Sequence, residues 1–150
     1  MASESFRANV GIVLTKNKEV LVFERADVEG AWQFPQGGID VSEIPLTAAY
    51  RELSEETGLS QTDVKLLAEY PEWLAYETPP NIRRKGSYLG QVQRWFVFEM
   101  LADDTAIDLN TDAHQEFVQY RWIDTSKLEP LTVDFRKPIY SKLTTFIQNL

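Results

Sequence analysis

The amino-acid sequence predicts an α/β fold in which a mixed β-sheet lies between helices. Three observations lead to this prediction. Segments rich in valine, isoleucine, leucine and aromatic residues recur along the chain and are typical of strands. An acidic segment from about Leu46 to Thr57 is typical of a helix, and the chain ends in an amphipathic helical segment. Its 150 residues are expected to form one domain, residues 1–150, with its own hydrophobic core.

The first part of the chain predicts a β-hairpin followed by a short extended element. Residues Arg7–Thr15 and Glu19–Arg25 are apolar, strand-like segments joined by a polar turn at Lys16–Lys18. Residues 31–36 (AWQFPQ) are expected to be extended, because proline disfavours helix at the residue before it. The pair Gly37–Gly38 then allows a tight turn with positive φ, and without β-carbons it lets the backbone approach a cation or a phosphate. A plain turn is the alternative.

The acidic segment predicts a helix that begins near Leu46 or Thr47 and ends at Gly58. Glycine is a common helix terminator because it adopts the left-handed backbone conformation without strain. The side of the helix that packs against the sheet is expected to carry the large or apolar residues that recur at helical spacing, namely Leu46, Ala49, Tyr50 and Leu53.

The second half of the chain predicts three more strands and the terminal helix. The strands are expected at Val64–Tyr70, Gln91–Leu101 and Glu116–Ile123. Residues 71–91, which mix aromatic, proline, glycine and basic residues, are expected to form a long irregular loop beside the functional site. The segment Val133–Leu150 is expected to end as a helix with one apolar side, made of Ile139, Leu143, Phe146 and Ile147.

Composition and charge argue against several classes of protein. No apolar run approaches the roughly 20 residues needed to cross a bilayer, and the first residues (MASESFRANV) lack the apolar segment of a signal peptide. With no cysteine, the chain has neither disulfides nor a thiolate metal site. The net charge of −8 argues against a general basic surface, so duplex DNA is not an expected partner. We expect a cytoplasmic monomer that does not bind membranes.

Three glutamates of the predicted helix point to a divalent cation. Glu52, Glu55 and Glu56 are spaced at i, i+3 and i+4, so one helical face carries all three carboxylates. Like charges at this spacing destabilise a helix unless a cation binds between them. The alternative is an acidic face that is simply exposed to water.

The same stretch resembles a known family. Gly37, five residues, Glu43, seven residues and then RELSEETGL from Arg51 to Leu59 fill every fixed position of the Nudix box. This resemblance implies an α/β/α Nudix sandwich with a mixed β-sheet. It also implies an enzyme that uses Mg²⁺, with Mn²⁺ as a substitute, to hydrolyse a nucleoside diphosphate linked to another group. A net negative charge is compatible with such a substrate, because divalent cations can lie between acidic residues and phosphates.

The resemblance also implies roles for the residues of the box. Either Glu52 or Glu56 takes the proton of the attacking water, and both alternatives stay open. Glu43 and Arg51 orient the metal-binding carboxylates, although Arg51 could instead be only a surface partner for a glutamate one turn away. The implied metal ligands are the carbonyl oxygen of Gly37 and the carboxylates of Glu52, Glu55 and Glu56.

A further acidic ligand from outside the box is common in the family. Glu116, just before the strand FVQYRW, is our choice, and Asp112 is its competitor. The alternative for Glu116 is an ordinary charge at the edge of a strand. We assign no catalytic role to His114, because a single histidine in a loop is more often a surface residue.

Segments outside the box resemble one branch of the family, which contains bacterial RNA pyrophosphohydrolases and plant-type diadenosine tetraphosphate hydrolases. They are RANVGIVL, AWQFPQGGID, EWLAYETPP, GQVQRWFVF and LTVDFRKPIY, so the resemblance covers Phe6 to Phe146. The residues that match candidate substrate contacts of that branch are Arg7, Tyr76, Gln91, Arg94, Phe135, Arg136 and Lys137.

These candidates have a chemical rationale and a structural alternative. The cations can donate charge-assisted hydrogen bonds to phosphates, Phe135 and Tyr76 can stack on a base, and Gln91 can donate to a phosphate or read a base edge. Phe135 could instead belong to the core, and Arg94 could cap a strand face. The basic run Arg83–Lys85 is either a grip on substrate phosphates or a solvated loop tip.

We therefore expect an enzyme that removes pyrophosphate from 5′-triphosphate RNA, with asymmetric cleavage of diadenosine tetraphosphate to ATP and AMP as the close alternative. A sanitiser of oxidised nucleoside triphosphates is disfavoured by the basic, aromatic segment 71–91. A Nudix domain that binds nucleotides without turnover is disfavoured because all the glutamates of the box are present.

Overall fold

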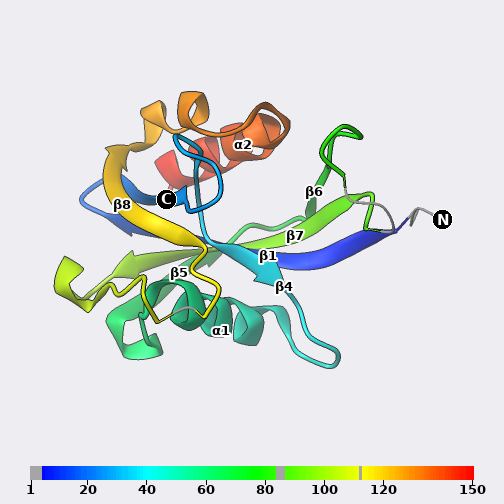
Figure 1. Ribbon diagram of the computed structural model, residues 1–150. Coiled ribbons are helices and arrows are strands. Elements are labelled where there is room, and N and C mark those ends of the chain that lie inside the picture. Colours follow the sequence, from blue (N-terminus) through cyan, green and yellow to red (C-terminus); the bar gives the residue numbers. More distant parts are fainter. Residues whose placement is uncertain (1–4, 84–86, 112) are drawn as a thin grey trace.

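The computed structural model describes residues 5–83, 87–111 and 113–150, which form an α/β/α sandwich (Figure 1). One mixed sheet has helix α1 (Pro45–Thr57) on one face and helix α2 (Lys137–Gln148) on the other. The predicted fold class is confirmed. In chain order, the strands are β1 (Phe6–Lys16), β2 (Glu19–Arg25), β3 (Trp32–Gln33), β4 (Gln36–Gly38), β5 (Val64–Glu69), β6 (Leu74–Glu77), β7 (Gly90–Met100) and β8 (Phe117–Asp124).

The sheet is built around the parallel pair β1–β7, with the strand order β3-β2-β1-β7-β5. The other strands join this path at its sides: β4 pairs with β1, β6 with β7, and β8 with β2. The middle of β1 and of β7 is a continuous apolar stretch, because a helix layer covers each face of these central strands. Since β4 pairs at Asn9–Gly11 and β6 at Gly90–Gln93, both short strands flank the same end of the central pair.

Successive side chains of each strand point to opposite faces of the sheet, so the core has two layers. On the α1 side, Ile12 and Phe96 pack with buried residues of α1 such as Leu53. On the α2 side, Trp95 packs with Tyr140 of α2. The expected apolar sides of both helices are confirmed, since Ala49 and Leu53 of α1 and Ile139 and Leu143 of α2 are buried, and Leu46, Tyr50, Phe146 and Ile147 pack against these layers.

Both ends of α1 have a sequence signal. The helix starts at Pro45, one residue before the predicted range, because a proline in the first turn needs no amide hydrogen. It ends at Gly58, which has a φ of 78° and donates its N–H to the Ser54 carbonyl. The predicted glycine terminator is therefore confirmed.

Two expectations were wrong. Residues 71–91 are not irregular throughout, because Leu74–Glu77 form β6 and pair with β7. Leu74 and Tyr76 are buried while Ala75 and Glu77 are exposed, a period of two that the surrounding prolines concealed. Gly37 and Gly38 do not form a turn with positive φ but belong to strand β4. Glycine is needed there because side chains crowd the strand from both faces, as described below.

No helix in the described part of the chain is long and apolar enough to cross a membrane.

Candidate active site

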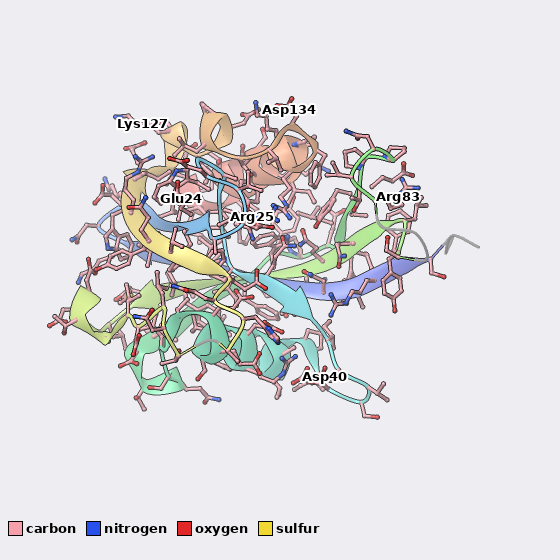
Figure 2. All side chains as sticks on the ribbon, in the orientation of Figure 1. Glu24, Arg25, Asp40, Arg83, Lys127 and Asp134 are labelled. Atoms are coloured by element: carbon pink, nitrogen blue, oxygen red, sulfur yellow. The ribbon has the colours of Figure 1, made fainter. Side chains whose placement is uncertain are left out.

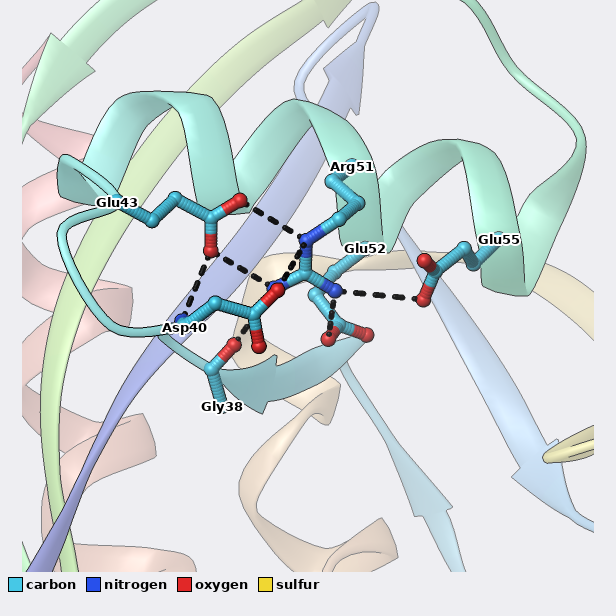
Figure 3. A network of polar contacts seen from close by, with 6 residues as sticks. All are labelled: Gly38, Asp40, Glu43, Arg51, Glu52 and Glu55. Carbon is cyan, nitrogen blue, oxygen red and sulfur yellow. Dashed lines mark hydrogen bonds and ion pairs between the residues drawn. The ribbon is translucent and has the colours of Figure 1, made fainter.

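Arg51 of α1 is the centre of a polar network between the helix and the end of β4 (Figure 3). Its Nε and Nη2 donate to the two oxygens of Glu43, each at 2.9 Å. Nη2 also donates to the Gly38 carbonyl at 2.8 Å. Nη1 donates to Glu52 at 2.9 Å and to Glu55 at 3.4 Å. One guanidinium thus joins the loop before the helix, the glycine strand and two of the three helix glutamates.

Glu43 fixes the entry of the chain into α1. Besides its two-pronged bond with Arg51, it accepts the backbone N–H of Asp40 at 3.0 Å. The Arg51 guanidinium is the main cause that lowers the pKa of Glu43 to about 2. The same pairing raises the pKa of Arg51 above its ordinary value, so both groups stay charged over the whole physiological range. The predicted orienting role of this pair therefore has a geometric basis.

Glu52 lies under β4, against the backbone of Gly37. A β-carbon added at Gly37 would overlap the Glu52 carboxyl group, so only glycine allows this approach. The Glu52 side chain is 12% exposed, and burial raises its pKa, opposed by the bond with Arg51. Glu52 also shares a hydrogen bond with Glu56, which is buried one turn further along α1. Two acidic groups and a glycine backbone therefore meet at one point.

This arrangement fits a hard divalent cation. Two carboxylates in contact repel each other when both are ionised, and a cation or a shared proton removes that repulsion. An all-oxygen donor set suits Mg²⁺ or Mn²⁺. The third glutamate, Glu55, is 54% exposed and directed toward Arg51. Within residues 5–83, 87–111 and 113–150, no three acidic or histidine side chains form a closed cluster, so the arrangement is a partial ligand set.

Three candidate substrate contacts form a row on the opposite face of the sheet. Gln91 of β7 is in register with Arg7 of β1 on one side and with Tyr76 of β6 on the other. A β-carbon at Gly38 would overlap the Arg7 guanidinium, so Arg7 packs over the strand residue next to Gly37. The glycine pair is thus covered by Glu52 from the α1 face and by Arg7 from the α2 face.

An aromatic and cationic group continues this row. The rings of Tyr76 and Phe135 lie 5.3 Å apart, and Phe135 and Arg136 belong to the 3₁₀ turn Asp134–Arg136 that precedes α2. The Arg136 guanidinium lies 5.7 Å from the Tyr76 ring and 5.2 Å from the Phe135 ring, and it donates to Gln33 at 2.7 Å. Five of the seven candidate contacts therefore lie on the α2 side of one sheet end, namely Arg7, Gln91, Tyr76, Phe135 and Arg136.

A family model described as NUDIX domain matches residues 5–143. The chain belongs to the Nudix family. This confirms the resemblance drawn from the box.

Curated relatives of this Nudix protein cover nearly its whole length. A protein of Acidiphilium cryptum named RNA pyrophosphohydrolase is 45% identical over 92% of this chain and 87% of its own length. A protein of Rhodospirillum rubrum with the same name is 42% identical over 92% of this chain and 84% of its own.

Solved structures of low sequence identity share the fold. The Escherichia coli dihydroneopterin triphosphate pyrophosphohydrolase is 19% identical with a TM-score of 0.76, covering 98% of this chain and 100% of its own. A Caenorhabditis elegans Ap4A hydrolase complex is 19% identical with a TM-score of 0.70, covering 96% of this chain and 99% of its own.

The extra metal ligand predicted outside the Nudix box stays a prediction. Glu116 lies at the entrance to β8, where its carbonyl accepts the N–H of Ala26 at 2.9 Å. It lines a pocket with His114, which also precedes β8, and with Asp27 of the loop that follows β2. Its competitor Asp112 lies outside the described residues. Because the described residues form no cluster of three acidic or histidine side chains, the placement of Glu116 does not complete the ligand set by itself.

Two predicted phosphate contacts are held by carboxylates. Arg94 points to the α1 side of β7, where it pairs with Glu69 and lies 5.8 Å from the Trp73 ring. The structure therefore does not bring it together with the row on the other face. Lys137 pairs with Asp134 at 2.9 Å, but Asp134 is almost fully exposed, so this ion pair is screened by solvent.

The basic run after β6 falls partly outside the described residues, which include Arg83 but neither Arg84 nor Lys85. Arg83 donates to the Thr78 carbonyl through Nη2 at 2.7 Å and Nε at 3.2 Å. These two bonds hold the Arg83 side chain against the backbone of the loop that follows β6. Figure 2 shows Arg83 on the opposite side of the sheet from Asp40, which marks the entrance to α1.

A network of buried amides under the row was missed by sequence reasoning. Gln93 Nε2 donates to Asn9 and to Gln36, each at 3.0 Å, and Gln36 Nε2 donates to the Tyr76 hydroxyl at 3.2 Å. Trp95 Nε1 donates to Gln93 Oε1 at 3.1 Å. These bonds fix the position of Tyr76. The signal was present as polar residues at inward-facing positions of apolar strands, but only strand pairing shows that they meet.

Proposed function

We propose that this Nudix protein hydrolyses the 5′-triphosphate end of RNA in a Mg²⁺-dependent reaction, releasing pyrophosphate and leaving a 5′-monophosphate. Relatives of this name at 45% and 42% identity over most of the chain support the proposal. A 5′-monophosphate end is the product of an early step in mRNA decay, so we place the protein in RNA turnover in the cytoplasm.

The observation that carries the proposal is that an acidic and a basic side chain pack against β4 from opposite faces of the sheet. Glu52 packs on Gly37 from the α1 face, and Arg7 packs on Gly38 from the α2 face. A polyphosphate lying along this edge can therefore meet acidic, metal-binding groups at one point and a guanidinium at the next. Beyond Arg7, the row leads to Gln91 and Tyr76, where the nucleoside of the substrate would lie.

The residues of the site have distinct tasks in this proposal. Mg²⁺, held by the Gly37 carbonyl and the carboxylates of Glu52, Glu55 and Glu56, supplies charge neutralisation and an acidified water when it is bound. Glu52 or Glu56 would accept the proton of the attacking water at a carboxylate oxygen, and both assignments stay open.

Arg51 acts on the α1 face of the sheet and Arg7 on the α2 face. Arg51 keeps Glu52 in place through a 2.9 Å bond while its other nitrogens are fixed on Glu43 and Gly38. Arg7 offers a charge-assisted donor to a phosphate oxygen from the other face. The leaving pyrophosphate would therefore depart from a site with cationic groups on one side.

Dinucleoside tetraphosphate hydrolysis is a second candidate, and an aromatic group on the α2 side is compatible with it. Tyr76 and Phe135 lie 5.3 Å apart with a 42° angle between rings, close to Arg136. Such a group can stack on a base of either substrate, because every base has a π-face. The fold of the Ap4A hydrolase structure is compatible with this second candidate.

A direct rate comparison tests the proposal. A short 5′-triphosphate RNA and diadenosine tetraphosphate are supplied at equal concentration with Mg²⁺, and the products are separated. We expect faster release of pyrophosphate from the RNA. Faster formation of ATP and AMP from the dinucleotide would refute the first candidate in favour of the second. Turnover of neither would refute both.

The variant Glu56→Gln tests whether the box glutamates perform the chemistry. We expect turnover to fall below detection with the melting temperature within a few degrees of the parent, because Glu56 becomes neutral without a change of shape. Glu129→Gln, an exposed glutamate of the turn Glu129–Leu131, is the matched control and should behave like the parent. Near-normal activity of Glu56→Gln would contradict the assignment of that residue.

A further inference from the structure

Side chains of β4, β6 and β7 form one chain of hydrogen bonds on the α2 face of the sheet. Trp95 Nε1 donates to Gln93 Oε1 at 3.1 Å, and Gln93 Nε2 donates to Gln36 Oε1 at 3.0 Å. Gln36 Nε2 then donates to the Tyr76 hydroxyl at 3.2 Å. We propose that Gln93 and Gln36 are positioning residues that hold the Tyr76 hydroxyl as a hydrogen-bond donor toward the substrate, which rests on the function proposed above.

Trp95 sets the direction of this hydrogen-bond chain. An indole N–H can only donate, whereas a glutamine amide has an accepting oxygen on one side and a donating nitrogen on the other. The Trp95 N–H therefore requires the oxygen of Gln93 to face it, which turns the Gln93 nitrogen away. Trp95 is fully buried and Gln93 is 1% exposed, so both groups have to find their partners within the protein.

Each later bond follows from that direction. Both hydrogens of the Gln93 amide are engaged, one by Asn9 Oδ1 and one by Gln36 Oε1, each at 3.0 Å. With its oxygen turned to Gln93, the Gln36 amide has only its nitrogen to offer to Tyr76. The Tyr76 oxygen is therefore the acceptor in this bond, and its own hydrogen remains available. In the part of the chain that the structure describes, no group accepts that hydrogen.

The available hydrogen belongs to a side chain that lies where the nucleoside end of the substrate is proposed to lie. Tyr76 is in register with Gln91, and its ring is held 5.3 Å from Phe135 and 5.7 Å from the Arg136 guanidinium. Gln36 is half-buried, so the last bond of the chain lies at the border of the site. Phosphate and sugar oxygens of a nucleotide accept hydrogen bonds from tyrosine hydroxyls. With the opposite direction, Tyr76 would donate to Gln36 instead.

The test reverses the last bond with Gln36→Glu. A carboxylate only accepts, so the new group takes the hydrogen of Tyr76. We expect kcat/KM for 5′-triphosphate RNA in Mg²⁺ to fall about 10-fold, as in Tyr76→Phe. The loss should lie in KM, with kcat within about two-fold of the parent, because this bond holds the nucleotide and not the reacting phosphate. Gln61→Glu, on the exposed turn Gln61–Asp63, is the matched control and should behave like the parent.

The double variant Gln36→Glu/Tyr76→Phe separates the direction of the bond from the added charge. If Gln36→Glu acts by taking the Tyr76 hydrogen, the double variant is no less active than either single variant. Losses that multiply would overturn the proposal, because the new charge would then act by itself. Gln36→Met leaves the Tyr76 hydrogen available and should lose less activity than Gln36→Glu, and equal losses of the two would also overturn it.

Gln93→Glu gives a second route to the same reversal, and it keeps the test valid if Gln36→Glu does not fold. The new carboxylate still accepts from Trp95, but it also accepts from Gln36, whose amide then turns its oxygen to Tyr76. The same loss of about 10-fold is expected, again without a further loss in combination with Tyr76→Phe. Multiplied losses in this combination would contradict the proposal.

Binding separates this inference from the proposed function. If the RNA is not turned over, the proposed function fails, and calorimetry with ATP in Mg²⁺ then decides the role of the hydrogen-bond chain. A weakening of about 10-fold that is equal in Gln36→Glu, in Tyr76→Phe and in their combination supports it without the RNA reaction. An unchanged affinity of Tyr76→Phe for ATP, or multiplied losses in the combination, refutes it.

Discussion

Replacing Arg51 by lysine keeps a positive charge on α1 but removes the planar fork that joins the helix to its surroundings. Arg51 reaches the Gly38 carbonyl at 2.8 Å through one nitrogen and Glu52 at 2.9 Å through another. The single nitrogen of lysine cannot reach both. Loss of one charge-assisted bond to a partly buried group lowers the free energy of unfolding by about 2 kcal/mol. For a chain of this length that corresponds to a melting temperature lower by about 4–8 °C.

The same substitution should weaken metal binding. Glu52 is held by Arg51 on one side and Glu56 on the other, so its carboxylate loses orientation when the arginine fork is removed. Removing a residue that orients a metal ligand typically costs 10–100-fold in affinity, and we expect a loss of about this size in the Mg²⁺ dissociation constant. Thermal unfolding without metal and calorimetric titration with Mg²⁺ measure the two effects separately.

Arg25→Lys is the matched control. Arg25 also forms a two-pronged bond, to Asp27 at 2.8 and 2.7 Å, but Asp27 is 64% exposed. An exposed pair of this kind contributes less than about 1 kcal/mol, so the melting temperature and Mg²⁺ affinity should stay close to those of the parent. Equal shifts in Arg51→Lys and Arg25→Lys would refute the reasoning, because they would show that Arg51 is only a surface partner of the helix glutamates.

Three further outcomes are expected. Gly37→Ala should weaken Mg²⁺ binding about 10–100-fold, because the new β-carbon displaces the Glu52 carboxylate. The melting temperature should change little, because only the end of a side chain has to move. Unchanged Mg²⁺ titration curves would contradict this. Phe135→Ala should lower kcat/KM for base-bearing substrates about 5–100-fold and that for inorganic tripolyphosphate much less; equal losses would indicate a core role. Burial raises the pKa of Tyr140 from 10.0 to about 12. The stability that this raised pKa gives the folded state is therefore complete below pH 10 and is lost as the pH rises toward 12. Between pH 8 and pH 11.5 the free energy of unfolding of the parent should fall by about 2 kcal/mol more than that of Tyr140→Phe, and equal falls of the two proteins in denaturant unfolding would argue against this.

The sequence by itself determined the elements with a strong local signal. The apolar runs of β1, β2 and β7 and the glycine at the end of α1 act within a few residues of themselves, so their type could be predicted from short segments. The family also followed from the sequence, because the Nudix box is a local pattern. The same reasoning placed Glu52 and Glu56 on one face of α1.

Only the tertiary structure decided how separate segments share space. Strand pairing put Arg7, Gln91 and Tyr76 in one row although they lie up to 84 positions apart, and it directed Arg94 to the other face. The role of Gly37 was predicted as a turn, whereas the structure uses it as a strand residue that Glu52 can approach. Such facts depend on register and on contacts across the sheet, which a local pattern does not contain. A shift of one residue in register would have turned every one of these side chains to the opposite face.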